Sequence, residues 1–447
     1  MRSWSNWPAI LQRKKDKGGR MQRRQFVQTV GAGVLSGTLG GGNAQASTAT
    51  SAQPRVVVVG GGYGGAVAAK YVRMWSDYGI HVTLVEPNAA FVSCPISNLV
   101  VGGSKTMADI SMPYDNLLTH HGVEWVRDLV TAMDADKRQV RLAGGGVLGY
   151  DRLIVSPGVD FMWETLPGLA LASARDKVLH AWKAGAQTLA LRKQLEAMPD
   201  GGVYALSIPA APYRCPPGPY ERACLVANYF SKAKPRSKVL ILDANDDVTA
   251  KGALFKKAWA ERYKDIIEYR PKHSVVDVDV FNQTLKFEFQ EDLKADVLNV
   301  IPGMRAGEIA WKSGLATASK RWCEVDFVSF ESKAAKNIHV VGDSILAAPG
   351  MPKSGHMANQ QGKTCAAAVV ALLTGQVPNG MPIYSNTCYS FVSDEDAVHV
   401  ASVHRYDTER KTMLPVLGAG GLSAAASPLE ANYAMAWARN IWADTLA

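Results

Sequence analysis

The sequence predicts an α/β protein with two Rossmann-like three-layer domains and a C-terminal α+β interface domain. Three observations support this fold class. A valine-rich segment at residues 55–59 runs into a glycine-rich turn and a helix-like segment, and a similar strand–helix–strand pattern returns at residues 203–243. A third strand-like segment, ending in Gly-Asp at residue 343, precedes a long apolar helix. Alternating strands and helices of this kind are typical of parallel sheets covered by helices.

The net charge of +9 is concentrated at the N-terminus. Residues 1–46 contain eight Lys or Arg residues and one Asp, which gives +7, so the other 401 residues carry only +2. A nearly neutral body gives no electrostatic reason to expect nucleic-acid binding. The sequence contains no run of 18 or more apolar residues, so we expect no stable membrane insertion.

The N-terminal segment has the order of a secretory leader. The pair Arg23-Arg24 precedes a short apolar, glycine-rich stretch, and the motif Ala-Gln-Ala at residues 44–46 is typical of a cleavage site. The arginine pair resembles a twin-arginine signal. We therefore expect residues 1–46 to be a twin-arginine signal peptide, removed at its end, and the mature protein to be periplasmic. Met21 is an alternative start, and a disordered basic tail is the alternative interpretation.

A dinucleotide-binding pattern follows the leader. The turn after the first strand fits G-x-G-x-x-G and contains five candidate cofactor-binding glycines: Gly60, Gly61, Gly62, Gly64 and Gly65. In this motif the first glycine makes the turn, the second admits a pyrophosphate and the third lets the helix approach the strand. Glu86 ends the next strand, 21 residues after the last of these glycines, where a carboxylate is expected to bind a ribose hydroxyl.

Two later segments favour FAD over NAD. Residues 150–158 form a strand-like segment that ends in a turn at Gly158, and residues 337–343 form another that ends at Asp343. Together with the glycine motif, they resemble the FAD-binding pattern of the pyridine nucleotide-disulfide reductase superfamily. The resemblance implies that Asp343 contacts the ribityl–phosphate region of the flavin, and we expect a further cofactor contact at Val130.

A helix predicted to open at Gly355 would direct its positive N-terminus at the flavin and favour the anionic reduced form. Lys353 precedes this helix. It is either a fixed cation beside the flavin or a solvated surface lysine, and its position does not decide between the two.

The second strand–helix–strand unit lacks the glycines of a nicotinamide site. Its turn, residues 209–219, contains five prolines. Proline has no amide hydrogen to offer a phosphate, and the side chains of this turn would block the close approach that glycines allow. NAD(P)H is therefore not expected as a substrate, and electrons must enter from another donor.

Three of the six cysteines are candidates for chemistry. Cys94 lies where the superfamily places a C-x4-C dithiol, but position 99 is Leu, so a single thiol would face the flavin. It could form a covalent flavin link, carry a peroxidase-type sulfenic acid or be a buried structural residue. Cys215 precedes a helix whose first turn contains Glu221, and Cys388 opens the C-terminal segment. The other cysteines, at positions 224, 323 and 365, are expected to be structural, and no metal site is predicted.

Several motifs resemble the flavoprotein subunit of flavocytochrome c sulfide dehydrogenase over essentially the whole mature chain. The most specific are RCPPGPYE at residues 214–221 and NTCYS at residues 386–390; PKSG, YDRLIVSPG and HAWKAGAQTLALRKQLE also match. The resemblance implies FAD bound covalently through an 8α-S-cysteinyl bond to Cys94. It also implies a redox disulfide between Cys215 and Cys388, with Glu221 as a proton acceptor.

The same resemblance implies that hydrosulfide attacks the disulfide, and that the electrons leave the flavin one at a time to a c-type cytochrome. The chain has no C-x-x-C-H motif, so a haem would belong to a partner subunit in a heterodimer. The rival interpretations are a sulfide:quinone reductase, a single-cysteine NADH-dependent peroxidase and a non-catalytic flavin-carrying partner of a sulfur-oxidation complex.

The predicted domain boundaries follow from these patterns. They are a discontinuous FAD-binding domain at residues 54–167 and 292–378, an NAD-binding-like domain without a nicotinamide site at residues 168–291, and an interface domain at residues 379–447.

Overall fold

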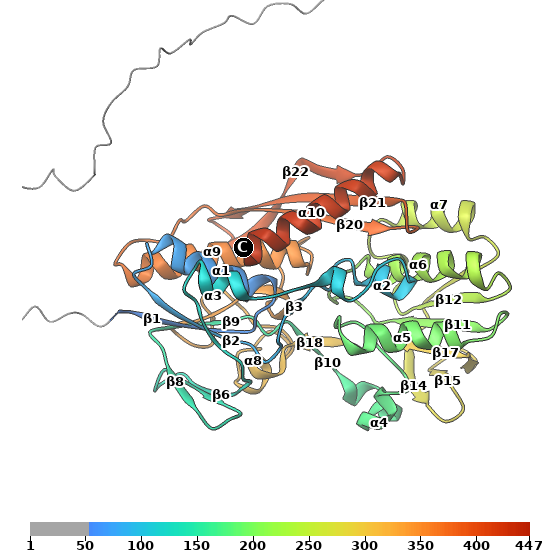
Figure 1. Cartoon of the computed structure of the whole chain (residues 1–447), viewed down its shortest axis with the longest axis horizontal. Coiled ribbons are helices and arrows are strands. Elements are labelled where there is room, and N and C mark those ends of the chain that lie inside the picture. The colour runs from blue at the N-terminus through green and yellow to red at the C-terminus, as the bar shows by residue number, and fades with distance from the viewer. Residues whose placement is uncertain (1–52) are drawn as a thin grey trace, which may run out of the picture. The chain divides into compact units, whose positions relative to one another are not determined.

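The computed structural model describes residues 53–447, and the predicted leader lies outside them (Figure 1). Within this range a parallel five-stranded sheet forms around the valine-rich strand β1, in the order β19-β9-β1-β2-β5. The strands are β1 (Arg55–Val59), β2 (His81–Val85), β5 (Glu124–Val126), β9 (Arg152–Val155) and β19 (Ile338–Val340). Four valines of β1 are almost fully buried, as expected for a parallel strand covered on both faces.

Two long helices and a small antiparallel sheet cover this first sheet. Helices α1 (Tyr63–Trp75) and α9 (Gly355–Leu373) pack against each other above it, and the three-stranded sheet β6-β7-β8 lies on the other side (Figure 1). The small strands are β6 (Val130–Asp134), β7 (Gln139–Leu142) and β8 (Val147–Gly149).

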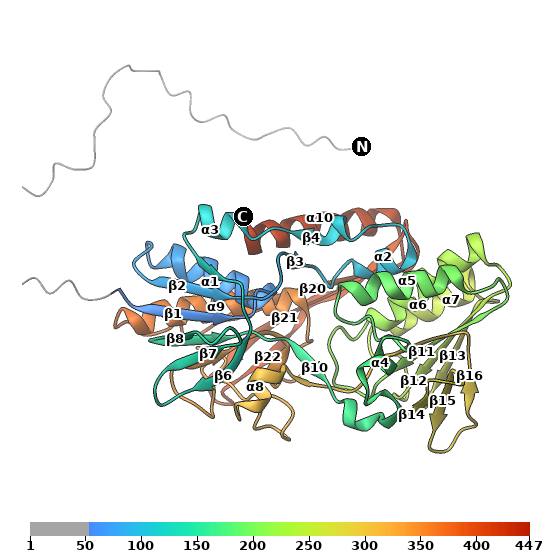
Figure 2. The ribbon, with the colours of Figure 1, turned by 60° about the horizontal axis from the view of Figure 1, so that its bottom comes forward.

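A second parallel sheet repeats the three-layer plan in the order β13-β12-β11-β17. Figure 2 shows helices α5, α6 and α7 on one side of it and the antiparallel sheet β14-β15-β16 on the other. The strands are β11 (Val203–Ile208), β12 (Lys238–Asp243), β13 (Ile267–Pro271), β14 (Val275–Asp279), β15 (Thr284–Phe287), β16 (Leu293–Lys294) and β17 (Val297–Val300). The helices are α5 (Ala186–Ala197), α6 (Gly218–Ala233) and α7 (Gly252–Arg262).

The C-terminal segment is an antiparallel sheet covered by one helix. Its elements are β20 (Ile383–Phe391), β21 (Ala397–Asp407), β22 (Thr412–Leu422) and α10 (Pro428–Leu446). Strand β20 packs on both α9 and α6, so it connects the two parallel-sheet units. Asp444 of α10 contacts both α1 and α9. It accepts a hydrogen bond from Tyr71 of α1 (2.6 Å) and forms an ion pair with Lys363 of α9 (2.7 Å).

Short elements complete the described chain: β3 (Phe91–Val92), α2 (Ser97–Gly102), β4 (Ser111–Met112), α3 (Asp115–Thr119), β10 (Val159–Phe161), α4 (Ala172–Arg175), β18 (Met304–Ala306) and α8 (Glu308–Lys312). Among residues 53–447, no helix combines the length and the apolar character needed to cross a membrane.

The predicted fold class is confirmed, with two three-layer units and a C-terminal sheet with its helix. The helix of the strand–helix–strand pattern predicted at residues 203–243 is α6, which begins within the proline-rich turn at Gly218. The C-terminal end of the chain belongs to the 19-residue helix α10.

Helices α1 and α9 approach each other closely at Gly64 and Gly362. We predict that adding one methyl group at this contact lowers the stability of the protein. A Cβ at Gly362 would lie 2.5 Å from the backbone oxygen of Gly64. In Gly362→Ala the helix-propensity gain of about 1 kcal/mol should be outweighed by the clash, with a net loss of about 1–3 kcal/mol. The measurement is the thermal unfolding midpoint. Gly380→Ala is the control, because nothing lies within 4 Å of a Cβ there; an equal midpoint for both variants would contradict the prediction.

Candidate functional site

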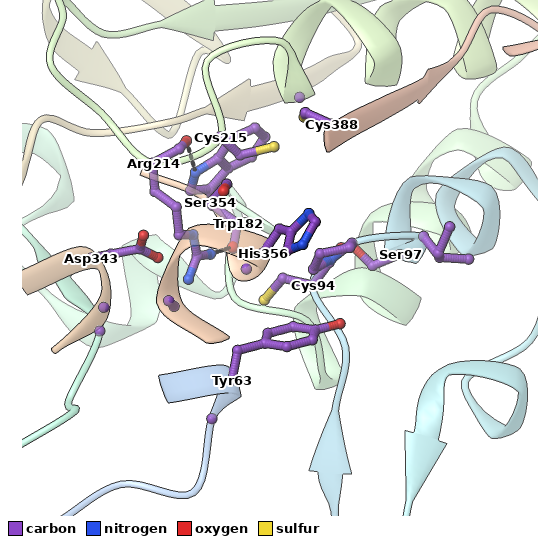
Figure 3. A pocket seen from close by; sticks show the side chains of 18 of the residues that line it. Tyr63, Cys94, Ser97, Trp182, Arg214, Cys215, Asp343, Ser354, His356 and Cys388 are labelled. Carbon is purple, nitrogen blue, oxygen red and sulfur yellow. Dashed lines mark hydrogen bonds between the residues drawn. The ribbon is translucent and has the colours of Figure 1, made fainter. Parts of the chain in front are cut away.

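One large cavity lies where the N-termini of α1, α6 and α9 approach strand β20. It encloses about 1250 Å³ of empty space, its open mouth included. Figure 3 shows side chains from these elements around it. The predicted site residues that line it are Gly62, Gly64, Cys94, Gly158, Cys215, Glu221, Asp343 and Cys388. Residues far apart in the sequence therefore meet at one cavity.

The glycine-rich turn has the geometry of a pyrophosphate cradle. A Cβ at Gly65 would lie 1.8 Å from the backbone oxygen of Gly60, whereas Gly62 has nothing within 4 Å of its Cβ position. The third glycine is thus required for helix–strand packing, and the second leaves open space at the helix N-terminus. The buried Glu86 carboxylate accepts hydrogen bonds from the amides of Gly61 (2.7 Å) and Asn88 (2.8 Å).

The part of the cavity wall next to this turn is made by Asp343 and the start of α9. Ser354 caps this helix by accepting a hydrogen bond from the amide of Met357 (3.0 Å). Burial raises the pKa of Asp343, although the cations of Arg214 and Lys353 oppose the shift. A carboxylate and two helix N-termini facing one elongated cavity, beside an open glycine turn, fit the phosphates and ribityl chain of FAD.

Six predicted cofactor contacts lie outside the lining of this cavity: Gly60, Gly61, Gly65, Glu86, Val130 and Lys353. The first four belong to the glycine-rich turn and to the end of the strand after it, beside the lining residues Gly62 and Gly64. Val130 is buried in β6, where it pairs with Leu142. Lys353 is not a surface lysine, since its residue is only 6% exposed. Its ammonium donates to the backbone oxygens of Asp343 (2.9 Å) and Ile345 and lies 3.8 Å from the centre of the Trp322 ring.

Three chain segments bring three cysteines to the cavity (Figure 3). Cys94 lies between β3 and α2, and its sulfur accepts a hydrogen bond from the amide of Ala184 (3.5 Å). Cys215 lies in the turn before α6 and has a left-handed backbone (φ +57°), a conformation that L-residues rarely adopt. Cys388 lies on β20, next to Cys215, and both are free thiols in this structure.

The environment shifts the pKa values of the two adjacent thiols in opposite directions. The hydrogen bond to Cys388, burial and the nearby Glu221 carboxylate all raise the pKa of Cys215. The hydrogen bond from Cys215, with a smaller contribution from the ammonium of Lys251, lowers the pKa of Cys388 to about 7. Two adjacent thiols whose ionisation depends on each other are candidates for thiol–disulfide exchange.

Glu221 is held on the first turn of α6 by two donors. Its carboxylate accepts hydrogen bonds from the amide of Phe391 (2.8 Å) and from the side chain of Asn98 (2.8 Å). Burial raises the pKa of this carboxyl group above its usual value. A buried carboxyl group beside two thiols is a candidate for proton exchange with them.

Several residues of the site were missed in the sequence. Arg214 lines the cavity, and Figure 3 shows its side chain extending between Asp343 and Cys94. Its place directly before Cys215 in RCPPGPYE was the available signal. Asn98 and Lys251 carry no sequence signal, because their roles depend on contacts with residues more than 100 positions away.

Comparisons with known proteins agree with this arrangement. Residues 54–198 match a family model for pyridine nucleotide-disulphide oxidoreductases. Residues 188–302 match the central domain of the sulfide dehydrogenase (flavocytochrome c) flavoprotein chain, and residues 380–446 match the flavin-binding domain of flavocytochrome c sulphide dehydrogenase.

Similar proteins and structures fall in the same group. The sulfide dehydrogenase (flavocytochrome c) flavoprotein chain of Chlorobaculum thiosulfatiphilum is 67% identical over 46 residues, which are 10% of this chain and 94% of that sequence. The mitochondrial sulfide:quinone oxidoreductase of Mus musculus is 28% identical over 303 residues, 64% of this chain and 65% of the relative, so the alignment spans slightly less than two thirds of that protein.

The crystal structure of the sulfide:quinone oxidoreductase from Aquifex aeolicus has the same fold. It matches with a TM-score of 0.72 and 19% identity over 88% of this chain and 91% of that one. The structural match shows only the fold. The two matches to sulfide dehydrogenase domain models and the 67% identity identify the family. The chain belongs to the family of flavocytochrome c sulfide dehydrogenase flavoprotein chains.

Proposed function

We propose that this protein is a flavin-dependent sulfide dehydrogenase that oxidises sulfide at a redox disulfide between Cys215 and Cys388. One observation carries the proposal: these two cysteines, which lie far apart in the sequence, are neighbours in the cavity that Cys94 and Asp343 also line. Family membership supports sulfide as the substrate. The proline-rich turn of the second nucleotide unit argues against a nicotinamide donor.

The chain's own residues supply the sulfur chemistry. Hydrosulfide attacks one sulfur of the Cys215–Cys388 disulfide, so that a new S–S bond forms on that cysteine as a persulfide. The old S–S bond breaks, and its electron pair leaves with the other cysteine as a thiolate. Glu221 takes up the proton of the incoming sulfur, because its carboxyl group has a raised pKa and lies beside the pair.

The proposed cofactor is FAD, held by the glycine turn, Glu86, Gly158 and Asp343, and attached through Cys94. Bound FAD would accept the electron pair of the reduced site and pass the electrons on singly. The remaining role of the pocket residues is to position the two cysteines and to keep bulk water out of the cavity.

The proposed electron acceptor is a c-type cytochrome subunit that forms a heterodimer with this chain. The family to which the chain belongs supports such a partner. The rival acceptor is a quinone, which the similarity to sulfide:quinone oxidoreductases favours. The proposed domain division remains 54–167 with 292–378, 168–291 and 379–447.

We predict that FAD is covalently attached through Cys94. This thiol is the cavity cysteine outside the adjacent pair, so it is free to bond the flavin. Acid precipitation of the mature protein should keep the flavin in the pellet, and Cys94→Ser should release it to the supernatant. Cys365→Ala, which changes a fully buried thiol of α9, should behave as the wild type. Complete release of flavin from the wild type would contradict the attachment.

We also propose export by the twin-arginine route. The intact mass of the protein recovered from the periplasm should correspond to a chain that begins at Ser47 and carries one FAD. A recovered chain that still contains Arg23 and Arg24 would show that the leader is not removed, and a purely cytoplasmic protein would contradict export.

The sulfide reaction is tested by replacing each member of the cysteine pair. Cys215→Ser and Cys388→Ser should keep bound FAD and a folded circular-dichroism spectrum. Anaerobic bleaching of the flavin by sulfide should slow at least about a hundredfold, which corresponds to roughly 2.7 kcal/mol of lost transition-state stabilisation. Cys365→Ala is again the control. If the flavin of either folded variant bleaches at the wild-type rate, the cysteine pair has only a structural role.

The same experiment can identify the electron acceptor, because reoxidation of the reduced flavin restores its colour. Sulfide-reduced protein should be reoxidised by a c-type cytochrome faster than by a short-chain ubiquinone, because the chain belongs to a flavocytochrome family. Preferential reoxidation by the quinone would assign the protein to the rival activity.

A further inference from the structure

A buried lysine lies beside the cysteine pair and has no part in the mechanism above. Lys251 is only 6% exposed, and it immediately precedes helix α7. Its ammonium donates to the backbone oxygen of Cys388 (2.7 Å) and to the hydroxyl of Ser390 (2.8 Å). The cation is therefore held on the strand that carries one of the two reactive sulfurs.

No carboxylate forms an ion pair with this ammonium anywhere in residues 53–447. Removing a charge from water without such a partner is costly, and burial lowers the pKa of Lys251 accordingly. The thiols of Cys388 and Cys215 and the carboxylate of Glu221 act in the opposite direction and favour the charged lysine. A thiolate on Cys388, whose backbone oxygen the ammonium already contacts, is thus an anion that can compensate the buried cation.

The backbone of Lys251 is also in an unfavourable conformation. Its φ is +57°, in the left-handed region, although glycine occupies the very next position. A turn that required only this backbone shape would be met by glycine at no steric cost. The lysine side chain therefore has a role of its own at this position, where the backbone conformation favours glycine.

The other charged groups that face the pair come from three elements. Glu221 lies on α6, and its negative charge opposes a thiolate on either cysteine. Arg214 lies on the turn before α6 and acts on Cys215. Arg222 donates to four neutral oxygen atoms, and Glu430 of α10 acts on Lys251. Among the charged groups of the described residues, Lys251 is the cation that lowers the pKa of Cys388.

A purely structural role would need only donors for one carbonyl and one hydroxyl. A neutral amide could make both hydrogen bonds without burying a charge. The geometry points to a different role.

We propose that Lys251 is a positioning residue whose ammonium holds Cys388 and stabilises its sulfur as the thiolate when the pair is reduced. This inference deepens the proposed function and rests on it for its catalytic meaning. The thiolate itself can be measured without sulfide, so the two can fail separately.

The test measures the ionisation of Cys388 in the mature, FAD-bound protein. In a Cys215→Ser background, the rate of Cys388 alkylation by iodoacetamide is followed against pH by peptide mass spectrometry. Adding Lys251→Met should raise the midpoint of this pH profile by about one pH unit, because an opposite charge close to a thiol favours its ionised form. Lys251→Arg, which keeps the charge, should leave the midpoint near that of the parent.

Two further variants complete the test. Lys363→Met removes a cation that is ion-paired with Asp444 outside the cysteine site, and it should not move the midpoint. Lys251→Gln replaces Lys251→Met if the latter does not retain FAD, since its amide can still donate to Ser390. An unchanged midpoint in a folded neutral variant, or an equal shift in Lys251→Arg, would overturn the proposal. Absence of sulfide oxidation in the wild-type protein, with the alkylation shift present in the Cys215→Ser series, would reject the proposed function alone.

Discussion

The site depends on the buried guanidinium of Arg222. Its four hydrogen bonds end on the side chains of Asn98 and Asn299 and on the backbone oxygens of His180 and Ala181, at 2.6–3.0 Å. An arginine removed from water must satisfy its donors, because each unpaired one would cost about 1–3 kcal/mol. The segments that supply these oxygens are therefore fixed relative to α6.

This network extends to both reactive positions. Asn98, oriented by Arg222, donates to Glu221 and to the backbone oxygen of Gly218 (3.1 Å) at the start of α6. Glu221 in turn accepts from the amide of Phe391 on β20, three residues after Cys388. The distance between the Cys215 turn and the Cys388 strand is thus set by a chain of buried hydrogen bonds, so the thiols would remain neighbours even without a covalent bond.

The environments of the cysteines explain why only some are suited to redox chemistry. Burial raises the pKa of both Cys224 and Cys323 to about 12, and that of Cys365 still further. These thiols stay protonated, which makes them poor nucleophiles. Cys388 is in the opposite situation, because a hydrogen-bond donor and a cation lower its pKa to about 7.

The sequence predicted the elements well because their signals are local. The valines of β1, the glycine turn and the two acids that end strands lie within short windows, and periodicity or turn chemistry reveals them. The pairing of Cys215 with Cys388 spans 172 intervening residues and came from family resemblance, since no local pattern encodes it. Lys251 and Asn98 escaped prediction for the same reason. The orientation of Lys353 depends on which backbone oxygens surround its ammonium, which spacing cannot reveal.

The second parallel-sheet unit has prolines and a cysteine in the turn where a dinucleotide-binding unit has glycines, and it keeps the same fold. Strand β11 and helix α6 keep the arrangement in which a helix N-terminus would bind a phosphate. In the turn between them, however, the amide of Cys215 donates to the backbone oxygen of Lys353 (2.9 Å), and that of Gly218 donates to Cys215 (2.9 Å). Prolines remove further donors, so the turn has little left to offer an external phosphate. The turn and the first turn of α6 instead present the Cys215 thiol and the Glu221 carboxyl group to the cavity.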